Sequence, residues 1–194
     1  MTSYSTKETA SELRKHLRRV WPEVKFSVRC NRGTASAWIG VAWTDGPTYT
    51  QARAQWSQFQ GAQFNGMTDS YDHIDPKLVC TNPAELPETR DYHCDGINGA
   101  RGFSDEVVQA TASQMVTENP EMAAAFAVED IDPNTLTANT LHRSAAMLTI
   151  TGDRWMTYLG EPLTGDIYDL GTAITAALNL TDYTTTGQPA RVER

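Results

Sequence analysis

The stretch "VAWTDGPTYT" (residues 41–50) contains the end of a strand, a tight turn and the start of a helix. Trp43 closes an alternating apolar run. The pair Asp45-Gly46 then favours a turn in which glycine takes a backbone conformation that other residues rarely adopt. Pro47 fixes the backbone at the exit from the turn. We therefore expect this corner to be a structural joint and not an active site.

A helix is predicted directly after the corner. Thr48, followed three residues later by Gln51, matches a capping box, in which each side chain satisfies a backbone group at a helix start. Ala52, Trp56 and Phe59 follow at helical spacing and form its apolar stripe. The helix should bury this stripe against the preceding strands.

Two strands and a further helix precede the corner. The runs "KFSVRC" (residues 25–30) and "AWIGVAW" (residues 37–43) alternate between apolar and polar positions, and a short polar connection between them favours an antiparallel hairpin. The segment "TASELRKHLRRVWP" (residues 9–22) carries Leu13 and Leu17 on an apolar side, as an amphipathic helix does. These elements predict an α-β-β-α unit whose two helices cover one face of the hairpin.

The rest of the chain is predicted to be helical after an irregular connection. The fold class is α+β: residues 1–80 form the α-β-β-α domain, residues 81–103 a connecting segment, residues 104–180 a mostly helical acidic part and residues 181–194 a mobile tail. The connecting segment is rich in Pro, Gly and Asn and has no sustained period.

Several helix starts can be placed in the acidic part. Ser104 can cap a helix whose first turn is acidic, and proline fits the first helical position at Pro120 and Pro133. A last helix is predicted within "GDIYDLGTAITAALNL" (residues 165–180), where Ile174 and Leu178 share a stripe.

Charge divides the chain unevenly. The net charge is −8 over 194 residues, but residues 1–80 hold ten Lys and Arg against seven Asp and Glu, or +3, whereas residues 81–194 hold six against seventeen, or −11. An acidic surface repels nucleic acid and membranes, so any contact with phosphate belongs to the N-terminal part. A general contribution to solubility also explains the acidic part.

Two further features indicate the compartment. No apolar run is long enough to span a bilayer, and residues 1–19 lack the apolar centre of a signal peptide. The three cysteines are an odd number and should be free thiols in a reducing compartment. We expect a protein of the host cell cytosol that has no membrane partner.

Three segments resemble a known family. "FSVRC", "WTDGP" and "FQGAQFNGMTDS" resemble, in this order and at similar spacing, the large polyvalent protein associated domain 29 family over roughly residues 5–80. The residues that carry the resemblance are Phe26, Val28, Trp43, Asp45, Gly46, Pro47, Phe64, Gly66, Met67 and Asp69. Asn65 stands where the family pattern has Asp, so any chemistry of that carboxylate would be lost here.

The resemblance implies a biological setting more than a reaction. The family is a small α+β domain of phage and conjugative-element proteins, within very large polypeptides that travel with the invading DNA and counter host defence. It has no agreed catalytic residues. The chain also lacks a Walker loop, a nucleophile elbow, a paired-histidine metalloprotease motif and a dinucleotide fingerprint, so we predict no catalytic residue and no cofactor.

Two clusters could in principle hold a metal ion. One is acidic and consists of Asp69, Asp72, His73 and Asp75; the other combines Cys80, His93 and Cys94 with Cys30 or His73. Carboxylates in a polar loop are usually solvated, neighbouring residues such as His93 and Cys94 point apart in a strand, and no Cys-x-x-Cys pair is present. The sequence therefore favours no bound metal.

The first predicted helix has a basic face. Together with nearby residues it could track a phosphate backbone through Arg14, Lys15, Arg18, Arg19, Arg29 and Arg32. No aromatic side chains accompany them for base stacking, and a solvated helix face or a complement to the acidic part explains the same charges.

These observations favour one function over two alternatives. The leading hypothesis is a non-enzymatic accessory protein of a phage or mobile element that binds a host protein and counters host defence. The first alternative is a nucleic-acid-binding module that uses the basic face. The second is an enzyme acting through the Asp69 to Asp75 cluster.

Overall fold

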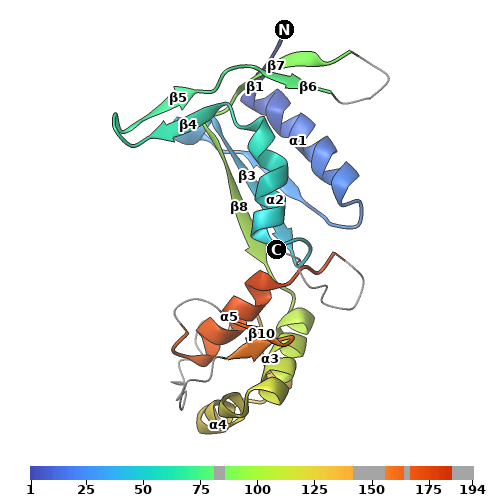
Figure 1. Ribbon diagram of the computed structural model, residues 1–194, viewed down its shortest axis with the longest axis vertical. Helices are drawn as coiled ribbons and strands as arrows, with labels where there is room; N and C mark the ends of the chain where they lie inside the picture. Colours follow the sequence, from blue (N-terminus) through green and yellow to red (C-terminus); the bar gives the residue numbers. More distant parts are fainter. Residues whose placement is uncertain (81–85, 142–155, 164–166, 185–194) are drawn as a thin grey trace. The chain divides into compact units, whose positions relative to one another are not determined.

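The computed structural model describes residues 1–80, 86–141, 156–163 and 167–184. These residues form helices and several small sheets, which confirms the α+β class (Figure 1). Within the described part of the chain, no helix combines the length and the apolar character that a membrane span requires.

The chain divides into two compact units. Unit 1 comprises Met1–Trp43 and Tyr49–Arg101, and unit 2 comprises Thr44–Thr48 and Gly102–Arg194. The turn of the corner, Thr44–Thr48, thus groups with unit 2, although both of its flanks belong to unit 1.

The predicted hairpin lies at the centre of unit 1. β2 (Ser27–Cys30) pairs antiparallel with β3 (Trp38–Thr44), with Val28 opposite Val41, and the short helical turn η1 (Gly33–Ala35) lies between them. β8 (Gly96–Gly102) adds a third strand, giving the order β2-β3-β8.

Two helices cover one face of this sheet, as predicted (Figure 1). They are α1 (Thr6–Val20) and α2 (Tyr49–Trp56), the latter extended by η2 (Ser57–Phe59). The core between helices and sheet consists of Ala10, Leu13, Leu17, Val28, Ile39, Val41, Trp43, Ala52, Trp56, Phe59, Tyr92, Cys94 and Ile97. The apolar alternation of β3 therefore points at the helices, and its other face carries Trp38 followed by the smaller Gly40, Ala42 and Thr44.

α1 begins earlier than its apolar stripe indicates. The Ser5 hydroxyl accepts a hydrogen bond from the Glu8 amide, and the Glu8 carboxylate accepts one from the Ser5 amide at 2.9 Å. This capping box starts the helix at Thr6 and lowers the pKa of Glu8, first through the hydrogen bond from the Ser5 side chain.

A second sheet and a separate hairpin complete unit 1. The second sheet has the order β1-β7-β6, in which β1 (Thr2–Ser5) is parallel and β6 (Lys77–Val79) antiparallel to β7 (Glu88–His93). The hairpin pairs β4 (Ala62–Asn65) with β5 (Ser70–His73).

Residues 81–103, which we expected to be a connecting segment, contain the strands β7 and β8. In the described part of that segment both strands pair within unit 1, which continues to Arg101. β7 escaped prediction because its sequence "ETRDYH" is mostly polar, and β8 because its three glycines resemble a loop.

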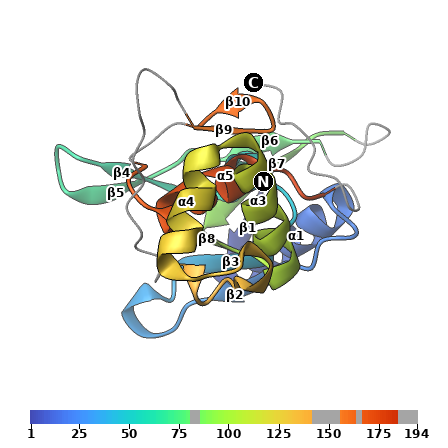
Figure 2. The ribbon, with the colours of Figure 1, turned by 90° about the horizontal axis from the view of Figure 1, so that it is seen from below.

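Unit 2 is built mainly from helices. As predicted, Ser104 caps α3 (Asp105–Glu118) and Pro120 opens α4 (Pro120–Glu129) (Figure 2). Asp169, which was not predicted as a cap, caps α5 (Leu170–Leu180). A small hairpin, β9 (Thr157–Tyr158) and β10 (Glu161–Pro162), accompanies them. The core of unit 2 includes Val108, Ala112, Met115, Met122, Phe126, Leu136, Leu170, Ile174 and Leu178.

Two expectations for this part need correction. A helix starting at Pro133 was predicted, but the described residues there form only the short turn η3 (Pro133–Thr135), and residues 142–155 lie outside the described part. A tail was expected from residue 181, but Tyr183 packs against the core of unit 2, and residues 185–194 lie outside the described part.

Candidate functional site

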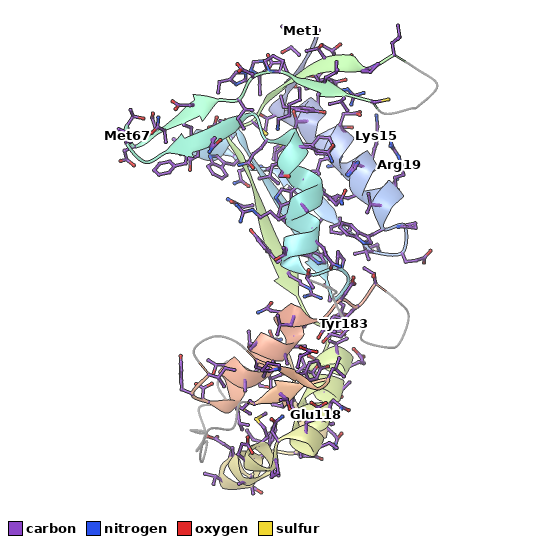
Figure 3. All side chains as sticks on the ribbon, viewed as in Figure 1. Met1, Lys15, Arg19, Met67, Glu118 and Tyr183 are labelled. Carbon is purple, nitrogen blue, oxygen red and sulfur yellow. The ribbon has the colours of Figure 1, made fainter. Side chains whose placement is uncertain are left out.

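The β4–β5 hairpin extends away from the rest of unit 1, as both views show (Figures 1 and 2). We call residues 62–73 the arm. Its strands pair from Ala62 opposite His73 to Asn65 opposite Ser70, and the turn between them contains Gly66, Met67 and Asp69. Met67 lies at the tip (Figure 3). The last group of residues that carries the family resemblance therefore occupies the arm.

The arm exposes large apolar side chains. Met67 is 97% exposed and Phe64 52%, and Tyr71 is also exposed. Side chains of this size usually gain about 1.5 to 3 kcal/mol when they leave water, so their exposure is a cost to the isolated protein. Within one short hairpin they form a candidate contact surface.

Asn65 organises the turn of the arm. Its side-chain oxygen accepts a hydrogen bond from the Met67 amide at 3.0 Å, and its side-chain nitrogen donates to the Asp72 carboxylate at 2.7 Å. Asp69 adopts a left-handed φ of 51°, which Asp tolerates better than most residues. An aspartate at position 65 could not donate to Asp72, so the amide has a structural role here.

Aromatic contacts hold the arm against β3. The rings of Phe64 and Tyr71 lie 5.3 Å apart, and Tyr71 meets Trp38 of β3 edge to face at 5.5 Å. Such pairs contribute about 0.5 to 1.5 kcal/mol beyond the area that they bury. The apolar surface of the arm is therefore held in place.

The acidic cluster predicted on this segment does not assemble as a metal site. Asp69 lies in the turn of the arm, Asp72 bonds Asn65, and His73 bonds Asp91 through Nε2 at 3.0 Å. A surface pocket along the arm is lined by Gln63, Phe64, Asn65, Gly66, Asp72, His73, Ile74 and Asp75. Its acidic side chains suit contact with a cation better than contact with an anion.

His73 instead joins a group that sequence reasoning did not assemble. Among the described residues, His73, Asp91 and His93 form a group whose potential ligand atoms all lie within 4.8 Å of one another. The signal for Asp91 was its position two residues before His93, because alternate residues of a strand share a face. The contact of Asp91 with His73 of β5 has no such signal in the sequence.

The cysteine and histidine set that the sequence offered as a weak zinc candidate does not come together through its cysteines. Cys94 is buried and its thiol donates to the Phe59 carbonyl at 3.2 Å, whereas Cys80 is exposed. Burial raises the pKa of the Cys94 thiol. Of the predicted zinc ligands, the structure brings His73 and His93 together and leaves the thiols out of that group.

The predicted basic face is only partly available for contact with phosphate, because some of its side chains bind groups within the chain. Arg14 donates to the Val28 carbonyl at 2.7 Å, and Lys15 pairs with Glu12 at 2.8 Å. Arg18 and Arg19 are exposed in the last turn of α1, where cations also stabilise the helix end (Figure 3 labels Lys15 and Arg19).

The remaining basic residues do not extend this face uniformly. Arg14, Arg18 and Lys25 line one surface pocket. Arg29 neighbours the buried Val28 on β2, so it points to the opposite face of the sheet from α1. Arg32 is exposed beyond the end of β2.

Comparison with known proteins gives one match. Residues 4–104 match the sequence profile of the large polyvalent protein associated domain 29. No curated protein and no solved structure matches the chain significantly. The matched residues include the end of β1, every later element of unit 1 and the whole arm.

Proposed function

Because this chain belongs to the large polyvalent protein associated domain 29 family, we propose that it is a non-enzymatic accessory protein of a phage or mobile element that binds a host protein through the arm. The observation that carries the proposal is the exposure of Phe64 and Met67. Both residues carry the family resemblance, yet neither is buried in the core of unit 1. Binding explains such side chains better than folding does.

The arm has the features of a binding element. Met67 is flexible and polarisable, which suits an apolar pocket, and aromatic residues are frequent among the side chains that dominate interface energies. The ring contacts of Tyr71 with Phe64 and Trp38 order the arm before binding, so little conformational entropy remains to be lost.

Charge favours a protein partner over nucleic acid at this surface. Asp69, Asp72 and Asp75 lie on or beside the arm, and no Lys or Arg occurs between Arg53 and Lys77. This surface would repel phosphate. We infer that the partner offers an apolar pocket bordered by basic side chains, at least one of which meets the acidic pocket along the arm.

The setting of the family supports a role against the host. Proteins that travel with invading DNA meet host defence proteins first, and a binding surface without catalytic groups would act by occupying a site on its target. A defence protein is therefore the partner that we propose.

Nucleic-acid binding by α1 is the second candidate. The pocket that gathers Arg14, Arg18 and Lys25 favours it. The hydrogen bond of Arg14 and the ion pair of Lys15 weaken it, because a bound phosphate would have to compete with these partners.

A comparison of variants in host lysate tests the two candidates together. The full chain is used as bait beside three variants. The arm variant combines Phe64→Ser and Met67→Ser, and the charge-reversal variant combines Arg18→Glu and Arg19→Glu. The control is Val128→Ser, which alters an exposed apolar residue of unit 2. We expect a host protein that the arm variant loses and the other two retain. Loss only in the charge-reversal variant, together with salt-sensitive gel shifts of DNA or RNA, would support the alternative.

A further inference from the structure

His73, Asp91 and His93 meet where the arm joins the rest of unit 1. His73 is the last residue of β5, whereas Asp91 and His93 belong to β7 of the second sheet. His73 Nε2 lies 3.0 Å from Asp91 Oδ1, and His93 Nε2 lies 3.1 Å from Asp91 Oδ2. The two imidazole rings stack with an interplanar angle of 17°. Two histidines thus direct the same ring nitrogen at one carboxylate.

These distances are close to those that a tetrahedral metal ion requires. With metal–ligand bonds of roughly 2.0 to 2.2 Å, neighbouring ligand atoms of a tetrahedron lie about 3.3 Å apart. The two nitrogen–oxygen distances are already slightly shorter, and all the donor atoms lie within 4.8 Å of one another. Small side-chain rotations would bring the two nitrogens to the bonding distance.

The surroundings of Asp91 also favour a cation. Its side chain is only 12% exposed, and a buried carboxylate needs a compensating charge or hydrogen bonds. The neighbouring Arg90 points its charge elsewhere, because it pairs with Glu88 at 3.0 Å and Glu12 at 3.7 Å. Both histidine side chains are about half exposed, so an ion can reach the group from solvent.

We propose that His73, Asp91 and His93 bind one divalent transition-metal ion of the zinc type, which fastens the base of the arm to β7. Two imidazole nitrogens and one carboxylate oxygen suit Zn²⁺, Co²⁺ or Ni²⁺, whereas Ca²⁺ and Mg²⁺ prefer all-oxygen sites. Water would complete the tetrahedron. On binding, the ion replaces the imidazole protons that now bridge each nitrogen to Asp91, and these protons are released or move to the other ring nitrogens. The site is independent of the proposed partner, because all three ligands come from this chain.

Titration of the full-length protein, made without a histidine tag, tests the site. Zn²⁺ binding is measured by calorimetry, and Co²⁺ binding by its visible absorption. The variants are His73→Ala, His93→Ala and Asp91→Asn, and the matched control is His16→Ala, which removes a histidine of unit 1 that contacts Gln55 and not this group. Circular dichroism verifies that each variant is folded.

The expected result is one equivalent of Zn²⁺ for the wild type and for His16→Ala, with affinity at least tenfold lower in each His73 and His93 variant, since each loses a direct ligand. Zn²⁺ should also slow hydrogen exchange of the β5 amides, and Mg²⁺ should not. Asp91→Asn should behave like the histidine variants if it folds. The proposal is overturned if the wild type takes up no stoichiometric Zn²⁺ at micromolar concentration, or if both histidine variants bind as tightly as the wild type.

Discussion

The backbone amide of Tyr183 donates a hydrogen bond to the carbonyl oxygen of Gly46 at 2.8 Å. Gly46 lies in the corner between β3 and α2, and Tyr183 follows α5, so the corner pairs with the segment that leaves α5. Asp45 adds to this arrangement, since its carboxylate accepts a hydrogen bond from the Ser104 amide at 2.9 Å. The corner thus anchors two distant segments of unit 2.

Gly46→Val tests the corner. Gly46 has φ 58°, a left-handed conformation that a β-branched residue adopts only with strain. We expect the free energy of unfolding to fall by about 1 to 3 kcal/mol, measured from the denaturant midpoint. Gly46→Asn is the matched control, because Asn tolerates this conformation and should cost less. Equal losses for Val and Asn would show that backbone strain is not the cause.

Gly61→Ala tests the attachment of the arm. A Cβ atom at Gly61 would lie 1.7 Å from the backbone oxygen of Tyr92 in β7, and Gly61 also accepts a hydrogen bond from the Ile74 amide at 2.8 Å. The backbone must separate to admit the methyl group, so we expect a loss of about 3 kcal/mol or more.

The control for this substitution is Gly66→Ala at the tip of the arm. There the nearest atom to a new Cβ lies 3.9 Å away, and the change in stability should stay within about 0.5 kcal/mol. A similar effect of both substitutions would contradict the close packing of Gly61 against β7.

The stability of unit 2 should depend on pH through Tyr183. Burial is the main cause that raises its pKa to about 12, from about 10 in the unfolded chain. The folded state favours the protonated phenol, so this contribution is complete below pH 10 and is lost as the pH rises through 12. We expect a loss of roughly 2 kcal/mol over that interval in urea unfolding, and a smaller loss in Tyr183→Phe. Identical pH dependence of the two proteins would show that Tyr183 titrates normally.

Cysteine reactivity should follow burial. Cys80 is exposed, whereas Cys94 is buried and burial raises the pKa of its thiol. Because the thiolate is the reactive form, iodoacetamide should modify Cys80 well before Cys94 in the native protein. Mass spectrometry of the modified peptides distinguishes the two, and equal rates at both positions would contradict the burial of Cys94.

Local patterns were sufficient for much of the fold. The alternation in β2 and β3, the stripe of α1 and the cap at Ser104 are signals within a few residues, and the structure agrees with them. β7 carries no such signal. Its Arg90 is buried beside Glu88 of the same strand, Glu12 of α1 and the Tyr4 ring of β1, which lies 5.4 Å from the guanidinium, and the last two come from other elements of the fold.

The candidate sites show the same limit. The sequence identified Phe64 and Met67 through the family resemblance, but their exposure depends on the arm leaving unit 1. It placed His73 among acidic neighbours and His93 among cysteines, whereas the structure joins both to Asp91. This grouping depends on β5 ending beside β7, which is a tertiary contact between two short and mostly polar strands.

Site-specific photocrosslinking in host cells tests the proposed binding surface most directly. A photoreactive phenylalanine analogue replaces Met67 at the tip of the arm, or Val128 on unit 2, which is also highly exposed, as the control. Our account predicts a covalent adduct with one host protein from position 67 and none from position 128. It would be contradicted by no protein adduct at position 67, by an adduct with nucleic acid there, or by the same adducts from both positions.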